Sequence, residues 1–318
     1  MAGGILDVDL LAFEQGDAQR RRAVVDGVMR SLATGFVFTT SDLPGALLDE
    51  AYGLLEQFFS LDVATKRRWQ VPGASGQCGY TGVLVETAAG SDHADWKEML
   101  NWSLPLPAHH PLRRRYPLFY PEPCLPEAAV PGITAVLETF HRRIADLQRR
   151  FLRVVALGLG VAETFFDTVV AEAPTLTRAI RYPSMAEAPS SNHLWAAAHG
   201  DINLITALPR ATAAGLQVQL DGRWLDVTPP PGQVILNAGL MLERLSNGLV
   251  PAGWHRVVAP TGVTAPRLSV VQFCHARPWT SLGPLASCCS AERPQRWPAI
   301  TAADALEDVL YQIRLLTE

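Results

Sequence analysis

From about residue 178 onward the chain consists of short β-branched segments separated by turn signals, and this texture constrains the fold most. Asp221–Gly222 lies between two alternating segments, and this dipeptide is a strong signal for a tight hairpin. Many short strands joined by turns are typical of a β-sandwich or a double-sheet jelly roll. The segments are RAIRYP, NLITAL, GLQVQL, RWLDV, QVILNAG, WHRVVAP and RLSVVQF.

The flanking regions carry helical periodicity instead. The segment around residues 129–157 repeats apolar residues at three- and four-residue spacing and places arginines on its other face. Residues 70–128 are rich in proline and glycine and are expected to form irregular covering structure. Further helices are expected at 17–35, which ends in the stop signal Gly35, at 43–61 and at 300–318.

We find no internal repeat, low-complexity linker or break in composition, so we expect one catalytic domain over residues 1–318. The expected class is α+β with a mainly β core, a double-stranded β-helix (jelly roll) framed by N-terminal and long central helices. Residues 1–177 would form a helical and covering region, 178–280 the jelly-roll core, and 281–318 a C-terminal segment and helix.

Composition and charge exclude several classes of function. A net charge of −4 gives no electrostatic basis for nucleic-acid binding. No signal peptide is visible, and no apolar run approaches the roughly 20 residues of a membrane span, so we expect no membrane partner. The five cysteines show no metal-site spacing, which favours a reduced, cytoplasmic location. No feature indicates an oligomeric state.

A histidine and an aspartate lie two positions apart in AAAHGDINLITAL, as His199 and Asp201. In a strand, such residues point to one face. Chance supplies such pairs in a chain with 8 histidines and 31 acidic residues, and His93–Asp95 is a second one. Only His199 has a suitable third partner, because His255 begins an apolar segment downstream. Two histidines and one carboxylate form the facial triad of non-haem iron(II) oxygenases, whereas His93–Asp95 is interpreted as a solvated turn.

An arginine and a serine follow His255 on one face of the last strand segment, as Arg267 and Ser269 in RLSVVQF. A guanidinium fork with a neighbouring hydroxyl is suited to binding a planar carboxylate. The pattern therefore indicates a ligand that carries a carboxylate near the three candidate metal ligands.

The ordered series HGD, HRVVAP and RLS resembles the iron(II)/2-oxoglutarate-dependent dioxygenase superfamily, in its isopenicillin N synthase-like branch. The similarity extends over nearly the whole chain, since GFVFTTSDLP and GYTGVLVETAAGSDHADWKEML resemble blocks of the N-terminal region. The resemblance implies an oxidoreductase that acts on a small molecule of specialised metabolism with Fe(II), O2 and 2-oxoglutarate as cosubstrate.

Carried over residue by residue, the resemblance implies that His199, Asp201 and His255 are the iron ligands and the catalytic centre. It implies that Arg267 and Ser269 hold the far carboxylate of 2-oxoglutarate. Tyr182, in RYP, matches a tyrosine that contacts the cosubstrate or the substrate in relatives. This chain departs from the family pattern at Ile180 and Leu240, where some relatives have an asparagine and an acid.

The resemblance leaves the reaction open between hydroxylation, desaturation and ring formation. Substrate contacts are expected from residues 79–102 and 275–290. Three alternatives remain on sequence alone. One is an iron oxidase that, like isopenicillin N synthase, uses no 2-oxoglutarate, because the same Arg-x-Ser pattern then binds the substrate's own carboxylate. The others are a jelly-roll binding protein without catalysis and a zinc hydrolase with three protein ligands.

Overall fold

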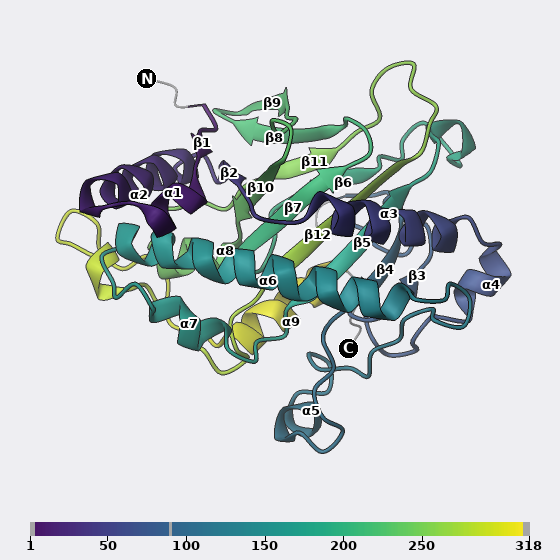
Figure 1. Cartoon of the computed structure of the whole chain (residues 1–318), viewed down its shortest axis with the longest axis horizontal. Coiled ribbons are helices and arrows are strands. Elements are labelled where there is room, and N and C mark those ends of the chain that lie inside the picture. The colour runs from purple at the N-terminus through teal and green to yellow at the C-terminus, as the bar shows by residue number, and fades with distance from the viewer. Residues whose placement is uncertain (1–3, 89–90, 314–318) are drawn as a thin grey trace.

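The computed structural model describes residues 4–88 and 91–313, and its centre is a pair of β-sheets that enclose an apolar core (Figure 1). The larger sheet has the order β1-β2-β10-β7-β12-β5-β4-β3, and the smaller one β6-β11-β8-β9. All the strand pairs are antiparallel except β1 with β2. The strands are β1 (Asp7–Val8), β2 (Phe36–Thr40), β3 (Gly79–Thr81), β4 (Glu98–Trp102), β5 (Leu176–Tyr182), β6 (Ala196–His199), β7 (Ile205–Ala211), β8 (Leu216–Leu220), β9 (Arg223–Asp226), β10 (Gln233–Ala238), β11 (His255–Val257) and β12 (Arg267–Cys274).

Side chains alternate along β12, so that its two faces contact different parts of the fold. Arg267, Ser269 and Phe273 line the cavity between the sheets, whereas Leu268 and Val270 pack into the core on the opposite face. This period of two is what a strand with both faces covered produces. The predicted mainly β core of facing sheets is confirmed.

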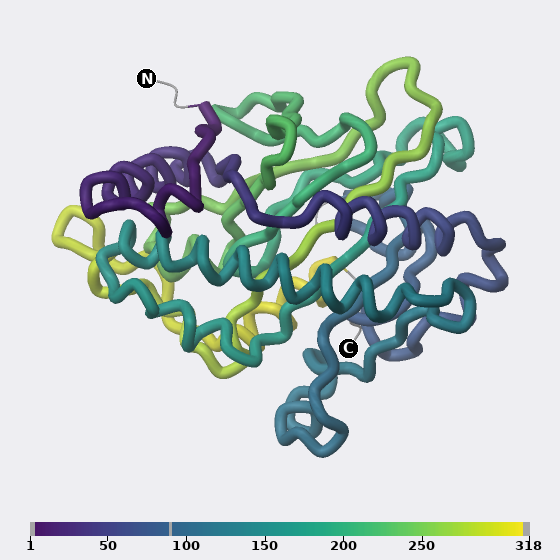
Figure 2. The backbone as a smooth tube through the Cα atoms, viewed as in Figure 1, coloured from purple at the N-terminus to yellow at the C-terminus, as the bar shows by residue number. Residues whose placement is uncertain are grey.

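Helices cover the outer face of the larger sheet. Figure 2 shows the long α6 running beside α3, and both α6 and β12 contribute to the same apolar core. The periodicity predicted a helix at 129–157, and α6 covers Ile133–Gly158 with its arginines in ion pairs away from the core. The helices are α1 (Leu10–Gln15), α2 (Ala18–Leu32), α3 (Gly45–Phe59), α4 (Val63–Arg67), α5 (Pro111–Arg115), α6, α7 (Phe165–Val170), α8 (Leu240–Leu245) and α9 (Ala302–Gln312).

The two glycine turn signals have the predicted roles. Asp221 and Gly222 both adopt positive φ, 50° and 75°, between β8 and β9, as a tight hairpin of this kind requires. Gly35 has φ 83° and follows the end of α2, and a Cβ here would lie 2.6 Å from Gly253 Cα. Glycine at this position therefore both stops the helix and lets the chain approach the loop before β11.

The prediction of irregular structure throughout 70–128 is wrong at β4. All five residues of this strand are buried, and it pairs with both β3 and β5. This strand was not predicted because it contains the polar residues Glu98 and Asn101, whose burial depends on partners elsewhere in the chain. The predicted C-terminal helix is present as α9, and residues 314–318 lie outside the described part. Within the described part, no helix has the length and apolar character to cross a membrane.

Candidate metal centre and substrate cavity

The side chains of His199, Asp201 and His255 come together where β6 ends and β11 begins, in the smaller sheet. One ligand atom from each lies within 4.8 Å of the others, and this is the only such group of histidine, cysteine and acidic residues in the described chain. His199 ends β6 and His255 begins β11, and the two residues are direct partners in the antiparallel ladder. Asp201 follows after Gly200, outside the strand, so the argument from strand alternation was wrong for Asp201. Its Oδ1 still lies 3.8 Å from His199 Nε2.

Backbone carbonyls orient both imidazoles. Nδ1 of His199 lies 2.8 Å from the carbonyl oxygen of Ala197, and Nδ1 of His255 lies 3.0 Å from that of Gly253. Since a carbonyl oxygen only accepts, each Nδ1 carries the proton and each Nε2 keeps its lone pair for a metal. Hydrogen bonds of this kind fix the ring orientation of metal-ligating histidines.

The carboxylate of Asp201 is held in a comparable way. Its Oδ2 accepts hydrogen bonds from Thr206 Oγ1 at 2.6 Å and from Asn237 Nδ2 at 2.8 Å. Oδ1 therefore remains free on the side of the imidazoles. Burial favours the neutral acid, but His255, His199 and these hydrogen bonds outweigh it and lower the pKa of Asp201. Desolvation, with a contribution from His255, lowers the pKa of His199 to about 4. One carboxylate oxygen and two imidazole nitrogens are a donor set that fits a divalent iron ion.

Arg267 lines a cavity of about 60 Å³ between the sheets, which the three candidate ligands also line. Its side chain is 1% exposed, and it forms no ion pair with any acid of the described residues. Nε donates to the carbonyl oxygen of Ala213, and Nη1 donates to Ser269 Oγ at 3.1 Å. A buried guanidinium without a counterion is costly, so the cavity fits an anionic ligand such as a carboxylate.

Tyr182 lies beside this arginine on β5. The two residues are ladder partners, and the guanidinium carbon lies 5.0 Å from the centre of the phenol ring. The ring also packs against Trp195 with the ring centres 5.5 Å apart. The structure thus places Tyr182, Arg267 and Ser269 in the lining of one cavity together with His199, Asp201 and His255.

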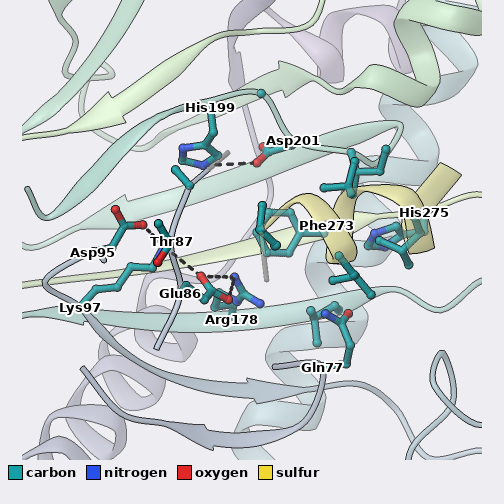
Figure 3. A pocket seen from close by; sticks show the side chains of 18 residues that line it. Gln77, Glu86, Thr87, Asp95, Lys97, Arg178, His199, Asp201, Phe273 and His275 are labelled. Carbon is teal, nitrogen blue, oxygen red and sulfur yellow. Dashed lines mark hydrogen bonds and ion pairs between the residues drawn. The ribbon is translucent and has the colours of Figure 1, made fainter. Parts of the chain in front are cut away.

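A second cavity of about 140 Å³ shares Lys97, Arg178, His199, Asp201 and Phe273 with the first (Figure 3). The expected segment 79–102 supplies part of its lining, including Glu86, Asp95 and Lys97. Of the expected segment 275–290, only His275 lines this cavity. Part of the apolar lining comes from α9, whose position at the cavity was not predicted from the sequence. The α9 side chains are Leu306, Val309 and Leu310, and Ile313 follows directly.

The interpretation of His93–Asp95 as a solvated turn is wrong for the aspartate. His93 is exposed, whereas Asp95 is buried and its Oδ1 accepts a hydrogen bond from the backbone N–H of Ala197 at 2.9 Å. Ala197 is also the residue whose carbonyl oxygen orients His199. Asp95 therefore braces the strand that carries a candidate ligand, and nothing in its local sequence indicated this role.

Comparisons with known proteins agree with this geometry. Residues 174–276 match the model of the 2OG-Fe(II) oxygenase superfamily, and residues 6–123 match that of the non-haem dioxygenase in morphine synthesis N-terminal region. A solved 2OG-Fe(II) oxygenase family protein from Caulobacter crescentus is 33% identical. The match covers 97% of this chain and 99% of that one, with a TM-score of 0.84.

More distant relatives extend the same pattern. Gibberellin 20 oxidase 2 of Oryza sativa subsp. indica is 28% identical over 302 residues, which are 94% of this chain and 74% of that protein. A full-length Neurospora crassa protein, crystallised in complex with alpha-KG, shares the fold at 21% identity with a TM-score of 0.83, and the match covers 96% of this chain and 95% of that one. The chain therefore belongs to the 2OG-Fe(II) oxygenase superfamily and is a 2-oxoglutarate-dependent dioxygenase that uses Fe(II), 2-oxoglutarate and O2.

Proposed function

We propose that the enzyme oxidises an unactivated C–H bond of a small molecule in specialised metabolism, by hydroxylation, desaturation or cyclisation. In this proposal His199, Asp201 and His255 hold the iron, and the chain 1–318 acts as one catalytic domain. The observation that carries it is the convergence of two free Nε2 atoms and one free Oδ1 at the point where the two cavities meet.

Arg267 and Ser269 are proposed to bind the distal carboxylate of 2-oxoglutarate. The buried guanidinium has no acidic partner among the described side chains, and it lines the same cavity as the triad. Tyr182 is proposed to form a wall of the same cavity and to fix the plane of the guanidinium by packing against it.

The bound ferrous ion and 2-oxoglutarate supply the oxidising chemistry, and the protein supplies orientation and protection from solvent. His199 and His255 keep their Nε2 lone pairs because backbone carbonyls hold the opposite nitrogens. The substrate is proposed to enter the larger cavity, which His199 and Asp201 line and Arg267 does not. The name of the rice gibberellin oxidase supports a small-molecule substrate of this kind.

Anaerobic addition of Fe(II) and 2-oxoglutarate tests the assignment. We expect a visible metal-to-ligand charge-transfer band, and succinate and carbon dioxide when O2 is admitted. Arg267→Ala should raise the 2-oxoglutarate concentration at which the band is half-maximal by about 100-fold, since a buried charge-assisted carboxylate contact is lost. His255→Ala should abolish the band. A band that neither change affects would place the iron and cosubstrate elsewhere, and product without succinate would indicate an oxidase that uses no 2-oxoglutarate.

A further inference from the structure

The polar wall of the larger cavity carries charges that neutralise one another. Lys97 Nζ lies 3.0 Å from a carboxylate oxygen of Glu86 and 2.8 Å from one of Asp95. Arg178 completes the cluster, with Nη1 at 3.2 Å from Glu86 (Figure 3). Two cations and two anions give this wall no net charge. We call Glu86, Asp95, Lys97 and Arg178 the buried ion cluster.

Most donors of the buried ion cluster are already occupied. Arg178 Nε donates to Asn101 Oδ1 at 2.7 Å, and its Nη2 donates to the carbonyl oxygen of Gly76 at 3.1 Å. Burial favours the neutral acid at Glu86, yet Arg178 and Lys97 lower its pKa to about 2. Glu86 is therefore ionised at neutral pH and paired within the cluster, so a charged ligand would find no spare counterion there.

Apart from the candidate iron ligands His199 and Asp201, one more titratable side chain lines this cavity, and it adds no charge. His275 is 4% exposed and follows β12 beside Phe273. Burial lowers the pKa of His275 to about 4, so the imidazole is neutral near pH 7. Figure 3 shows His275 close to the ribbon of α9.

Apolar side chains also line this cavity, and one of them, Phe273, packs against Arg178 with the guanidinium carbon 5.4 Å from its ring centre. Phe273 and Leu176 come from the larger sheet, and Leu306, Val309 and Leu310 come from α9. A volume of about 140 Å³ is close to that of an engineered apolar cavity, roughly 150 Å³, that binds benzene. Pockets with mainly apolar walls and a few fixed polar groups are typical small-molecule sites.

We propose that the substrate of this enzyme is an uncharged, largely apolar small molecule about the size of one six-membered ring with short substituents. Its apolar body lies against α9 and Phe273, and its reacting carbon faces His199 and Asp201. An ionised substrate is disfavoured because the buried ion cluster has no free counterion, and burying an unpaired charge is costly. The inference rests on the proposed function only in taking this cavity as the substrate site.

Three probes with one skeleton test the charge preference: 3-phenylpropanol, 3-phenylpropanoate and 3-phenylpropylamine. Calorimetric titration of the full-length protein, anaerobic with Fe(II) and 2-oxoglutarate, should show the alcohol binding at least about tenfold more tightly than either ion. Equal or tighter binding of an ion would overturn the proposal. Binding of none of the three at millimolar concentration would also overturn it, because the cavity would then not accept a single-ring molecule.

A charge-changing variant links the preference to the buried ion cluster. Glu86→Gln leaves the cluster with one excess positive charge and should raise the affinity for 3-phenylpropanoate relative to the alcohol by about tenfold. Glu98→Gln is the matched control, because Glu98 is also buried with two cations, Lys66 at 2.7 Å and Arg181 at 2.8 Å, but does not line either cavity. In Glu98→Gln, the ratio of the affinities for 3-phenylpropanoate and 3-phenylpropanol should not change. An unchanged ratio in Glu86→Gln would contradict the role of the cluster.

The same titrations without iron and 2-oxoglutarate separate this inference from the proposed function. A missing charge-transfer band together with the expected order of probes would refute the iron-site assignment and leave the cavity's preference standing. A normal band together with a preference for an ion would refute only the substrate class.

Discussion

Asn237 Nδ2 donates a hydrogen bond to Oδ2 of Asp201 over 2.8 Å and thereby leaves Oδ1 facing the two imidazoles. Both side chains are buried, Asn237 on β10 and Asp201 after β6. We predict that Asn237→Ala weakens Fe(II) binding by about tenfold, because removing a hydrogen bond that orients a ligand typically costs 10–100-fold. Anaerobic Fe(II) titration measures this.

Asn247→Ala is the control for a general loss of stability. Asn247 is also a buried asparagine, but its Nδ2 donates to the carbonyl oxygen of Pro294, far from the candidate ligands in the fold. This variant should unfold at a lower urea concentration and bind Fe(II) as the unaltered protein does. If Asn237→Ala bound Fe(II) as tightly as the unaltered protein does, Thr206 alone would be sufficient to orient Asp201.

Ser269 extends the polar surface of Arg267, whose Nη1 donates to its hydroxyl oxygen at 3.1 Å. We predict that Ser269→Ala raises the dissociation constant of 2-oxoglutarate about fivefold, which corresponds to about 1 kcal/mol for one neutral hydrogen bond. The charge-transfer band at increasing 2-oxoglutarate gives this constant. Ser246→Ala serves as the control, since Ser246 is buried, accepts a hydrogen bond from the backbone N–H of Val250 and lines neither cavity, and it should leave the constant unchanged.

The parts of the fold that local patterns determine could be predicted from the sequence. The apolar stripe of α6, the hairpin at Asp221–Gly222 and the stop at Gly35 each depend on residues close together in the chain. The convergence of His199 and His255 could be predicted because strand order and motif order follow the family resemblance. The first three predictions rest on physical rules that operate over a few residues, whereas the convergence of the histidines rests on the resemblance.

The residues that support the site could not be predicted in this way. His93–Asp95 and His199–Asp201 have the same spacing, yet Asp95 is buried against the backbone of Ala197 while His93 is exposed. Asn237 gave no sequence signal beyond its place in a strand segment. These roles depend on contacts between segments that lie far apart in the chain, and local patterns in the sequence do not reveal which polar residue meets which partner.

Asp95 is predicted to be far more important for stability than His93. Asp95→Ala leaves Lys97 with one fewer counterion and leaves the N–H of Ala197 without its acceptor. We expect a loss of about 3 kcal/mol in the free energy of unfolding, the magnitude typical of breaking a buried ion pair from one side. Urea unfolding measures it. His93→Ala, at an exposed position, should change the free energy by less than about 0.5 kcal/mol, and similar losses in the two variants would contradict the structure.

His141, buried on α6, is predicted to make stability depend on pH. Its Nδ1 lies 2.7 Å from Thr177 Oγ1, and burial lowers its pKa from 6.5 to about 3. Between about pH 6.5 and pH 3 the unfolded chain binds a proton that the folded chain does not, so stability falls as pH falls, by up to about 1.4 kcal/mol per pH unit. Above pH 6.5 the group contributes no slope. His141→Gln, which retains an acceptor for Thr177, should remove this part of the slope in urea unfolding between pH 6 and pH 4, whereas His109→Gln at an exposed position should keep it. Parallel curves for His141→Gln and the unaltered protein would show that His141 is protonated inside the fold.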